Sequence, residues 1–328
     1  MWWIFILILI LALAYLLSLP KRYTVTRSIV IAKPVGEVFA YVRDFSNWTA
    51  WSPWSLHEPD HQLTIDRPTE LGGLYAWDGK KIGAGQMQHT GITLNERVDI
   101  LLTFLRPFKN TAKVVWSFRS APNDACEITW DMQSQMPLPM RPMQAFIAKM
   151  IGYDFALGLA LLRGKLDPTS EHPSITFNGV VERGAQTYVT EHFEGTLVDM
   201  RGAMKEAYPR LWQRLSKDTE RWEKKPAIAA YHKVKFMKAT TVMDMGFAVK
   251  QLNAGEAGLA LPADKYFQMT MRGSYDFLPS SWNTVHGQVK MLKLKIDKSR
   301  PALEVYQINP MEAPNSNDWT TLLCVPIK

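Results

Sequence analysis

One glutamate in this sequence has the setting of a side chain that contacts a ligand. Glu304 lies in the run PALEVY, whose composition predicts a strand. Alternation along a strand puts Glu304 and Tyr306 on one face and Leu303 and Val305 on the other. If the Leu-Val face packs on a helix, Glu304 and Tyr306 face a cleft. The alternative is an exposed glutamate on an edge strand.

A carboxylate in an apolar cleft is costly unless it is paired, and its pKa tends to rise. A bound cation would offset that cost. Three aromatic residues, Tyr231, Trp282 and Tyr306, are candidates to add cation–π attraction of about 0.5–2 kcal/mol. These residues and Glu304 form one predicted ligand-binding group.

A second polar group lies in the segment HEPDH, where His57 and His61 flank Glu58 and Asp60. Histidines four residues apart are typical of a zinc-binding helix. However, Pro59 lies between them and no third ligand is evident. We therefore predict a solvated loop here and no metal site.

Common catalytic motifs are absent from the sequence. It has no GxSxG, no glycine-rich phosphate loop and no Cys/His nucleophile pair, so no catalytic residue and no cofactor is predicted. Cys126 and Cys324 are far apart, each within a strand-like run. We predict buried free thiols, which suit a reducing compartment.

The elements before the linker Lys165–Pro173 predict a domain over residues 23–168. A strand over Tyr23–Lys33 is followed by a helix that begins at Pro34, because proline suits a first helical turn. A long helix over Met140–Leu166 closes the domain. Between them we expect six strand-like runs: His61–Asp66, Gly73–Asp78, Ala84–Leu94, Arg97–Phe104, Thr111–Phe118 and Ala125–Met132.

Aromatic and methionine side chains are candidate pocket residues in this domain. The stretch FSNWTAWSPW contains Trp51 and Trp54, and the long helix carries Phe146 and Met150. Aromatic rings offer large contact areas, and methionine adapts its shape to a ligand. The alternative for all four is ordinary core packing.

Residues 174–328 contain an internal repeat. Phe193–Thr196 and Met271–Ser274 each precede an amphipathic helix, expected over residues 201–215 and 280–294. The strands PAIAAY and PALEVY follow these helices with a shift of 75 residues, which aligns Ala229 with Glu304. Each half therefore reads strand, helix, strand, strand. We expect the halves to pair about a pseudo-two-fold axis with a cleft between them.

The first domain resembles the START-like, or helix-grip, superfamily of polyketide cyclase/dehydrase-like proteins. The similarity rests on RSIVIAKPVGEVFAYVRDFSNWTAWSPW, YAWDGK and GAGQMQ and covers about residues 22–168. It implies an α+β fold in which a curved antiparallel sheet and a long helix enclose an apolar cavity. Members bind lipids, hormones or polyketides, and some are catalytic.

The second domain looks like the GyrI-like family, related to effector-binding domains of bacterial regulators. The stretches PALEVYQINP and WTTLLCVPIK carry the similarity. Family members bind drugs and other apolar cations in a central cleft, and some are hydrolases. The resemblance implies that Glu304, in the ExY position, meets a cationic ligand or acts as a base.

The N-terminus predicts a membrane anchor over residues 1–22. Residues 2–19 are uncharged and apolar, and as a helix they extend about 27 Å, close to the hydrocarbon core of a bilayer. Lys21 and Arg22 follow, which by the positive-inside rule places the remainder on the cytoplasmic side of the inner membrane. A cleaved signal peptide is the alternative, although the basic n-region is missing.

Composition is that of a globular protein, with 47% hydrophobic and 21% charged residues among 328. The net charge of +7 is compatible with nucleic acid or an anionic membrane, but no nucleic-acid-binding motif is visible and none is predicted as a partner. The expected function is binding of small hydrophobic or amphipathic molecules as a sensor or carrier. The alternative is an enzyme, a cyclase or a hydrolase that uses Glu304.

Overall fold

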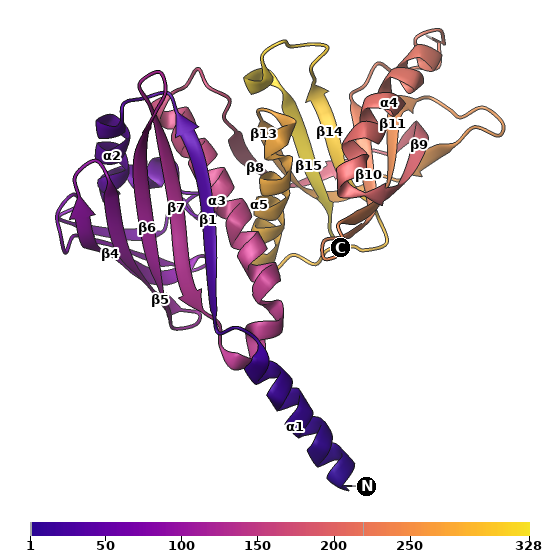
Figure 1. The fold of residues 1–328 in the computed structure, drawn as a ribbon. Coiled ribbons are helices and arrows are strands. Elements are labelled where there is room, and N and C mark those ends of the chain that lie inside the picture. Colours follow the sequence, from indigo (N-terminus) through magenta and orange to yellow (C-terminus); the bar gives the residue numbers. More distant parts are fainter. Residues whose placement is uncertain (1, 219) are drawn as a thin grey trace. The chain divides into compact units, whose positions relative to one another are not determined.

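A computed structural model describes residues 2–218 and 220–328. The chain forms two compact units, the first ending at His172 and the second spanning Pro173–Lys328. Each unit combines one antiparallel sheet with helices, so the predicted α+β class is confirmed (Figure 1).

The sheet of the first unit has seven strands in the order β1-β7-β6-β5-β4-β3-β2. Consecutive strands pair through short turns, and β1 closes the order by pairing with β7. The strands are β1 (Arg22–Ile31), β2 (Gln62–Asp66), β3 (Leu74–Gly79), β4 (Gly83–Thr93), β5 (Arg97–Arg106), β6 (Asn110–Ala121) and β7 (Ala125–Gln135).

Two short helical segments follow β1. Helix α2 (Val35–Arg43) begins directly after Pro34, as predicted, and buries Val38, Phe39 and Val42. The tryptophan-rich stretch forms the 3-10 helix η1 (Phe45–Ala50), because the Asp44 carboxylate accepts a hydrogen bond from the Ser46 amide and caps its first turn.

The long helix α3 (Gln144–Leu166) runs along β1 and supplies Phe155, Leu159 and Leu162 to the core. It begins four residues later than expected, after the 3-10 helix η2 (Leu138–Met143). Pro142 lies inside η2 and has no amide hydrogen to donate to a regular α-helical bond.

Helix α1 (Trp2–Ser18) is apolar along its length and buries none of its residues. Within the described chain, one helical segment is both long and apolar enough to cross a bilayer, Leu138–Leu166. That segment contains α3, which packs on the sheet as a core helix. With 17 residues, α1 falls just short of the length of a typical span.

The second unit has an eight-stranded sheet in the order β12-β9-β11-β10-β14-β15-β13-β8. Its strands are β8 (Ser174–Arg183), β9 (Gln186–Thr196), β10 (Ala227–Lys235), β11 (Thr240–Val249), β12 (Gly258–Leu261), β13 (Asp264–Arg272), β14 (Ala302–Ile308) and β15 (Thr320–Pro326). Its helices are α4 (Leu197–Leu215), η3 (Tyr275–Phe277), α5 (Leu278–Met291) and η4 (Ser316–Asp318).

The predicted internal repeat is confirmed by this order. One half is β9-α4-β10-β11 and the other is β13-α5-β14-β15, and the two meet where β10 pairs with β14. Strands β8 and β12 were not predicted from the sequence. Each of these strands precedes one half and pairs with the other half, β8 with β13 and β12 with β9.

Both repeat helices begin earlier than expected. Helix α4 starts at Leu197 because Thr196 is its N-cap: the Thr196 hydroxyl accepts a hydrogen bond from the Asp199 amide at 3.1 Å. Helix α5 starts at Leu278, after the turn η3 that follows Gly273. Gly273 has a φ of 124°, a conformation that favours glycine.

Candidate ligand-binding site around Glu304

Glu304 lies at the centre of the second unit's sheet. The strands β10 and β14 pair antiparallel, with Ala229 opposite Glu304, Tyr231 opposite Ala302 and Ala227 opposite Tyr306. The repeat predicted that the positions of Ala229 and Glu304 would meet at the pseudo-two-fold axis. The register confirms this, so Glu304 is on a central strand and the edge-strand alternative is wrong.

The face of β14 that carries Glu304 is the face covered by the helices. Trp282 of α5 contacts Glu304, and Tyr306 packs in a cluster with Ala207 of α4. Leu303 and Val305 lie in a different cluster, with residues of β10 and β15. The condition that the Leu-Val face packs on a helix is therefore not met. Strand alternation fixes which side chains share a face but not which face the helices cover.

The carboxylate of Glu304 is 2% exposed and accepts three hydrogen bonds. The Trp282 indole Nε1 donates to Oε1 at 2.6 Å, and the Tyr231 hydroxyl donates to Oε2 at 3.1 Å. The Tyr306 hydroxyl also donates to Oε2. The structure thus brings together all four residues of the predicted ligand-binding group.

Burial raises the pKa of Glu304, although the hydrogen bonds from Tyr306, Trp282 and Tyr231 oppose the rise. All three donors are neutral groups, so they satisfy the oxygens without neutralising the charge. Across residues 2–218 and 220–328, no lysine, arginine or histidine forms an ion pair with this carboxylate. The site is a buried acid that lacks a counter-ion.

Two more tyrosines, Tyr208 and Tyr275, pack against Tyr306 beside Glu304. Tyr208 of α4 meets Tyr306 edge-on with ring centroids 5.9 Å apart, and Tyr275 meets Tyr306 at 5.4 Å. Burial, and then the charge of Glu304, raise the pKa values of Tyr208 and Tyr275, so both rings are neutral phenols. Sequence reasoning missed both residues. Tyr208 was detectable only as one of several aromatics in the amphipathic helix, and Tyr275 as a neighbour of the Gly273 turn.

The four pocket residues predicted in the first unit are placed differently from one another. Trp51 is 1% exposed and packs with the rings of Trp116 and Trp130, so it is a core residue. Trp54 is 36% exposed and meets Trp130 and Phe155 edge-on. A ligand role for Trp51 and Trp54 stays a prediction.

Phe146 and Met150 lie in the first turns of α3 and are partly exposed. Deeper along the same helix, the Phe155 ring stacks on Trp130 with centroids 3.9 Å apart. Trp130 in turn stacks on Trp116 at 4.4 Å. The three stacked rings occupy the space between the sheet and the part of α3 around Phe155. Any pocket lined by Phe146 and Met150 therefore lies towards the start of α3.

The segment HEPDH is not the solvated loop that was predicted. His57 and Glu58 are each 6% exposed. The Glu58 carboxylate accepts hydrogen bonds from the backbone amides of Lys80, Lys81 and Ile82, at 3.0, 2.8 and 3.1 Å, and so holds the β3–β4 turn. Burial would raise the pKa of Glu58, but these amides outweigh it and the pKa is lowered. In the described part of the chain, no three metal-ligating side chains cluster.

Both units match known families. Residues 22–167 match the family model described as polyketide cyclase / dehydrase and lipid transport. Residues 180–328 match the model of the GyrI-like small molecule binding domain. Both units thus have folds of small-molecule-binding families. The search of curated proteins found no match.

Among solved structures, the chain is similar to SAV2435 bound to tetraphenylphosphonium, with 13% identity over 47% of this chain and 94% of that one and a TM-score of 0.36. It is similar to protein MLL2253 from Mesorhizobium loti, with 12% identity over 45% and 99% and a TM-score of 0.36. It is also similar to the Aha1 dimer from Colwellia psychrerythraea, with 11% identity over 44% and 96% and a TM-score of 0.34.

Proposed function

We propose that this protein is a membrane-anchored sensor or carrier whose second unit binds a lipophilic cation at Glu304. The observation that supports the proposal is the carboxylate of Glu304, which is 2% exposed and has only neutral hydrogen-bond donors around it. Burying such a charge is costly, and a cation that enters the site would offset the cost. Aromatic faces around the carboxylate would attract the same cation.

Access to the site favours a ligand with apolar groups. Tyr231 and Trp282 remain partly exposed, whereas Tyr306 beneath them is buried. Tyr231 and Trp282 meet edge-on with centroids 6.1 Å apart, so together they form the outer wall over Glu304. A ligand that reaches the carboxylate must displace this wall, and apolar substituents would then contact the exposed rings.

The proposed anchor is α1. Its 17 residues extend about 26 Å as a helix, and none is buried. The Arg141 guanidinium of η2 donates hydrogen bonds to the carbonyls of Leu16 and Leu19, both at 3.2 Å, and so caps the end of α1. This contact would hold the first unit close to the membrane surface.

The end of the first unit that joins α1 has the surface expected of a membrane-facing end. Strand register places the start of β1 and the β5–β6 turn at the same end of the strands. In that turn Phe108 is 78% exposed and is followed by Lys109. Lys21 precedes β1 and Arg22 is its first residue. Exposed aromatic and basic residues suit an interface with anionic lipid, which also supports a cytoplasmic location.

The first unit is proposed to bind a lipid or another hydrophobic molecule near the start of α3. The family that it matches includes lipid transport in its description. Phe146 and Met150 are partly exposed there, and Met143 before them is 51% exposed. A saturable signal from a fluorescent lipid probe, weakened by Met150→Glu, is the expected result. Equal binding by that variant would count against this location.

Calorimetry with tetraphenylphosphonium tests the cation site. We expect the full-length protein in a non-ionic detergent to bind this probe, and Glu304→Gln to weaken binding at least tenfold, because the substitution removes the carboxyl group that would pair with the cation. Glu194→Gln, at an exposed position on β9, is the matched control and should change nothing. Triphenylphosphine oxide, a neutral analogue, should bind equally to wild type and Glu304→Gln. Equal tetraphenylphosphonium affinity for both proteins would refute the proposal.

An enzymatic role is the second candidate. The raised pKa of Glu304 and its contact with the Tyr306 hydroxyl suit a general base in a hydrolase. Turnover of ester or amide substrates that disappears in Glu304→Gln would favour this role. Binding of tetraphenylphosphonium without any such turnover would favour the sensor or carrier.

A further inference from the structure

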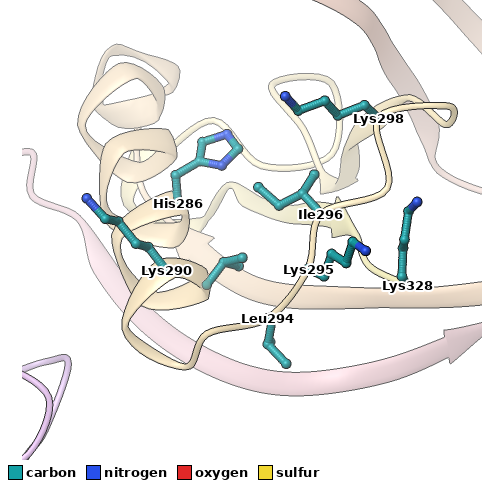
Figure 2. Close-up of a pocket in the computed structure, with 8 residues that line it drawn as sticks. His286, Lys290, Leu294, Lys295, Ile296, Lys298 and Lys328 are labelled. Atoms are coloured by element: carbon teal, nitrogen blue, oxygen red, sulfur yellow. The ribbon is translucent and has the colours of Figure 1, made fainter.

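A groove in the second unit, apart from the Glu304 site, lies beside the end of α5 and has a volume of about 650 Å³. Its apolar lining consists of Val289 from α5 and of Leu294 and Ile296 from the segment that follows. His286 borders it on the helix side. Figure 2 shows Ile296 between His286 and the lysines Lys295 and Lys328, with Lys298 above Ile296. Lys290 also borders the groove, but its amine points away.

The backbone around the groove is firmly held. Ile296 forms an isolated bridge with Ile327, and the Lys328 amide donates to the Lys295 carbonyl at 2.8 Å. The Asp297 amide donates to the Pro326 carbonyl at 2.9 Å. These bonds place Lys295 and Lys328 side by side although they are far apart in sequence. Tertiary structure therefore brings Lys295 and Lys328 together, and Lys298 borders the same groove.

The positive charge at this rim is not balanced by acidic side chains. Across the described residues, Lys295, Lys298 and Lys328 form no ion pair with an acidic side chain. Asp297, the acidic residue between them, binds Ser299 and Arg300, and these bonds lower its pKa to about 2. Gathering like charges is unfavourable, and an anion at the rim would relieve the repulsion.

The lining and the rim together define the chemistry of a ligand. Val289 is buried and Leu294 and Ile296 are partly buried, which leaves an apolar surface for a hydrocarbon chain. Burial lowers the pKa of His286, so this ring is neutral and adds no charge on the helix side. Amines on one side and apolar groups beneath them fit a molecule with an anionic head and an apolar tail.

We propose that this groove binds an anionic amphiphile with a phosphate or carboxylate head, which lies on Lys295, Lys298 and Lys328. The groove differs from the Glu304 site in the sign of the charge it selects. The two are separated by Trp282, which stacks on His286 with centroids 5.6 Å apart and donates its indole hydrogen to Glu304. The ring face of Trp282 thus borders the groove side and its indole nitrogen borders the cation site.

Octyl phosphate is the probe, titrated into the full-length protein in nanodiscs of zwitterionic phosphatidylcholine, with empty nanodiscs subtracted. We expect saturable binding to wild type. Combining Lys295→Gln, Lys298→Gln and Lys328→Gln should weaken it at least tenfold. The matched control combines Lys233→Gln, Lys235→Gln and Lys238→Gln, which removes the same charge from exposed positions near the β10–β11 turn and should leave affinity unchanged.

The proposal is overturned if octyl phosphate does not saturate, if the two triple variants lose affinity equally, or if inorganic phosphate binds as tightly as octyl phosphate. Glu304→Gln should leave octyl phosphate binding unchanged, so failure here is distinct from failure of the cation site. Adding phosphatidylglycerol to the nanodiscs distinguishes the sources of the ligand. Competition with octyl phosphate assigns the groove to a membrane lipid, and its absence assigns it to a free amphiphile.

Discussion

Glu304 lies directly opposite Ala229 across the antiparallel pair of β10 and β14. The two residues are repeat equivalents, separated by 75 positions, and they face each other at the axis that relates the halves. One half therefore supplies a carboxylate and the other a methyl group, which is fully buried. This asymmetry puts a single carboxyl group at the centre of a nearly symmetric sheet.

Stability of the second unit should depend on pH through Glu304. Its folded-state pKa is raised above 4.5, so the folded state binds the proton more tightly than the unfolded state does. The contribution of Glu304 protonation to the free energy of unfolding is complete below pH 4.5, and it is lost as pH rises through the folded-state pKa. The free energy of unfolding of wild type, minus that of Glu304→Gln, should fall across this window.

Native-state hydrogen exchange of peptides from β10 and β14 measures this difference apart from the first unit. Glu194→Gln is again the control and should show no such difference from wild type. A wild-type minus Glu304→Gln difference that is flat with pH would mean that the pKa of Glu304 is ordinary.

Loss of the Glu58 carboxylate should destabilise the first unit. In Glu58→Ala the amides of Lys80, Lys81 and Ile82 lose their shared acceptor, and losing hydrogen bonds to a charged group costs about 1.5–3 kcal/mol. Glu96→Ala, at an exposed position, should cost little. Chemical denaturation followed by tryptophan fluorescence measures both, and equal midpoints for the two variants would contradict the role of Glu58.

Gly79 offers an independent check of the same contact. A Cβ atom at this position would lie 2.4 Å from Oε2 of Glu58 and 2.6 Å from Cγ1 of Ile82, so Gly79→Ala must displace the carboxylate or the turn. We expect Gly79→Ala to destabilise wild type by more than it destabilises Glu58→Ala. Additive effects of the two substitutions in a double-mutant cycle would argue against the contact.

The core of the first unit should depend more on Phe155 than on Phe146. Phe155 is 1% exposed and stacks on Trp130, so Phe155→Ala should cost about 3–5 kcal/mol. Phe146 is partly exposed, so Phe146→Ala should cost less than Phe155→Ala. Thermal unfolding of both variants compares them directly. A Phe146→Ala variant as unstable as Phe155→Ala would show that the start of α3 is more tightly packed than its exposure indicates.

Removal of residues 1–22 should release the protein from membranes. Helix α1 buries none of its residues, so the truncated chain should stay folded. Full-length protein should remain in the pellet after an alkaline carbonate wash, while the truncated chain should appear in the supernatant with an unchanged far-UV circular dichroism spectrum. Recovery of the full-length protein in the supernatant would rule out the anchor.

Local pattern determined much of this fold from the sequence alone. Pro34 marked the start of α2, and alternating residues marked the strands of the first sheet within a few positions. In the second sheet, β8 and β12 were not predicted. The repeat by itself paired Ala229 with Glu304, because a two-fold arrangement of equal halves brings equivalent positions together. Alternation also put Glu304 and Tyr306 on one face, and Cys126 and Cys324 are buried and free as expected.

Only the tertiary structure decided what each face meets. Alternation in PALEVY is the same whichever face the helices cover, so it could not show that Glu304 lies beneath α5 and receives the Trp282 indole. Glu58 read as a loop residue because its partners, the amides at 80–82, lie more than twenty positions away. Lys295 and Lys328 meet for the same reason, through backbone pairing between distant segments. Hydrophobic periodicity and composition are local properties of the sequence. The burial of a side chain and the pairing of its charge depend on contacts that form only when the chain folds.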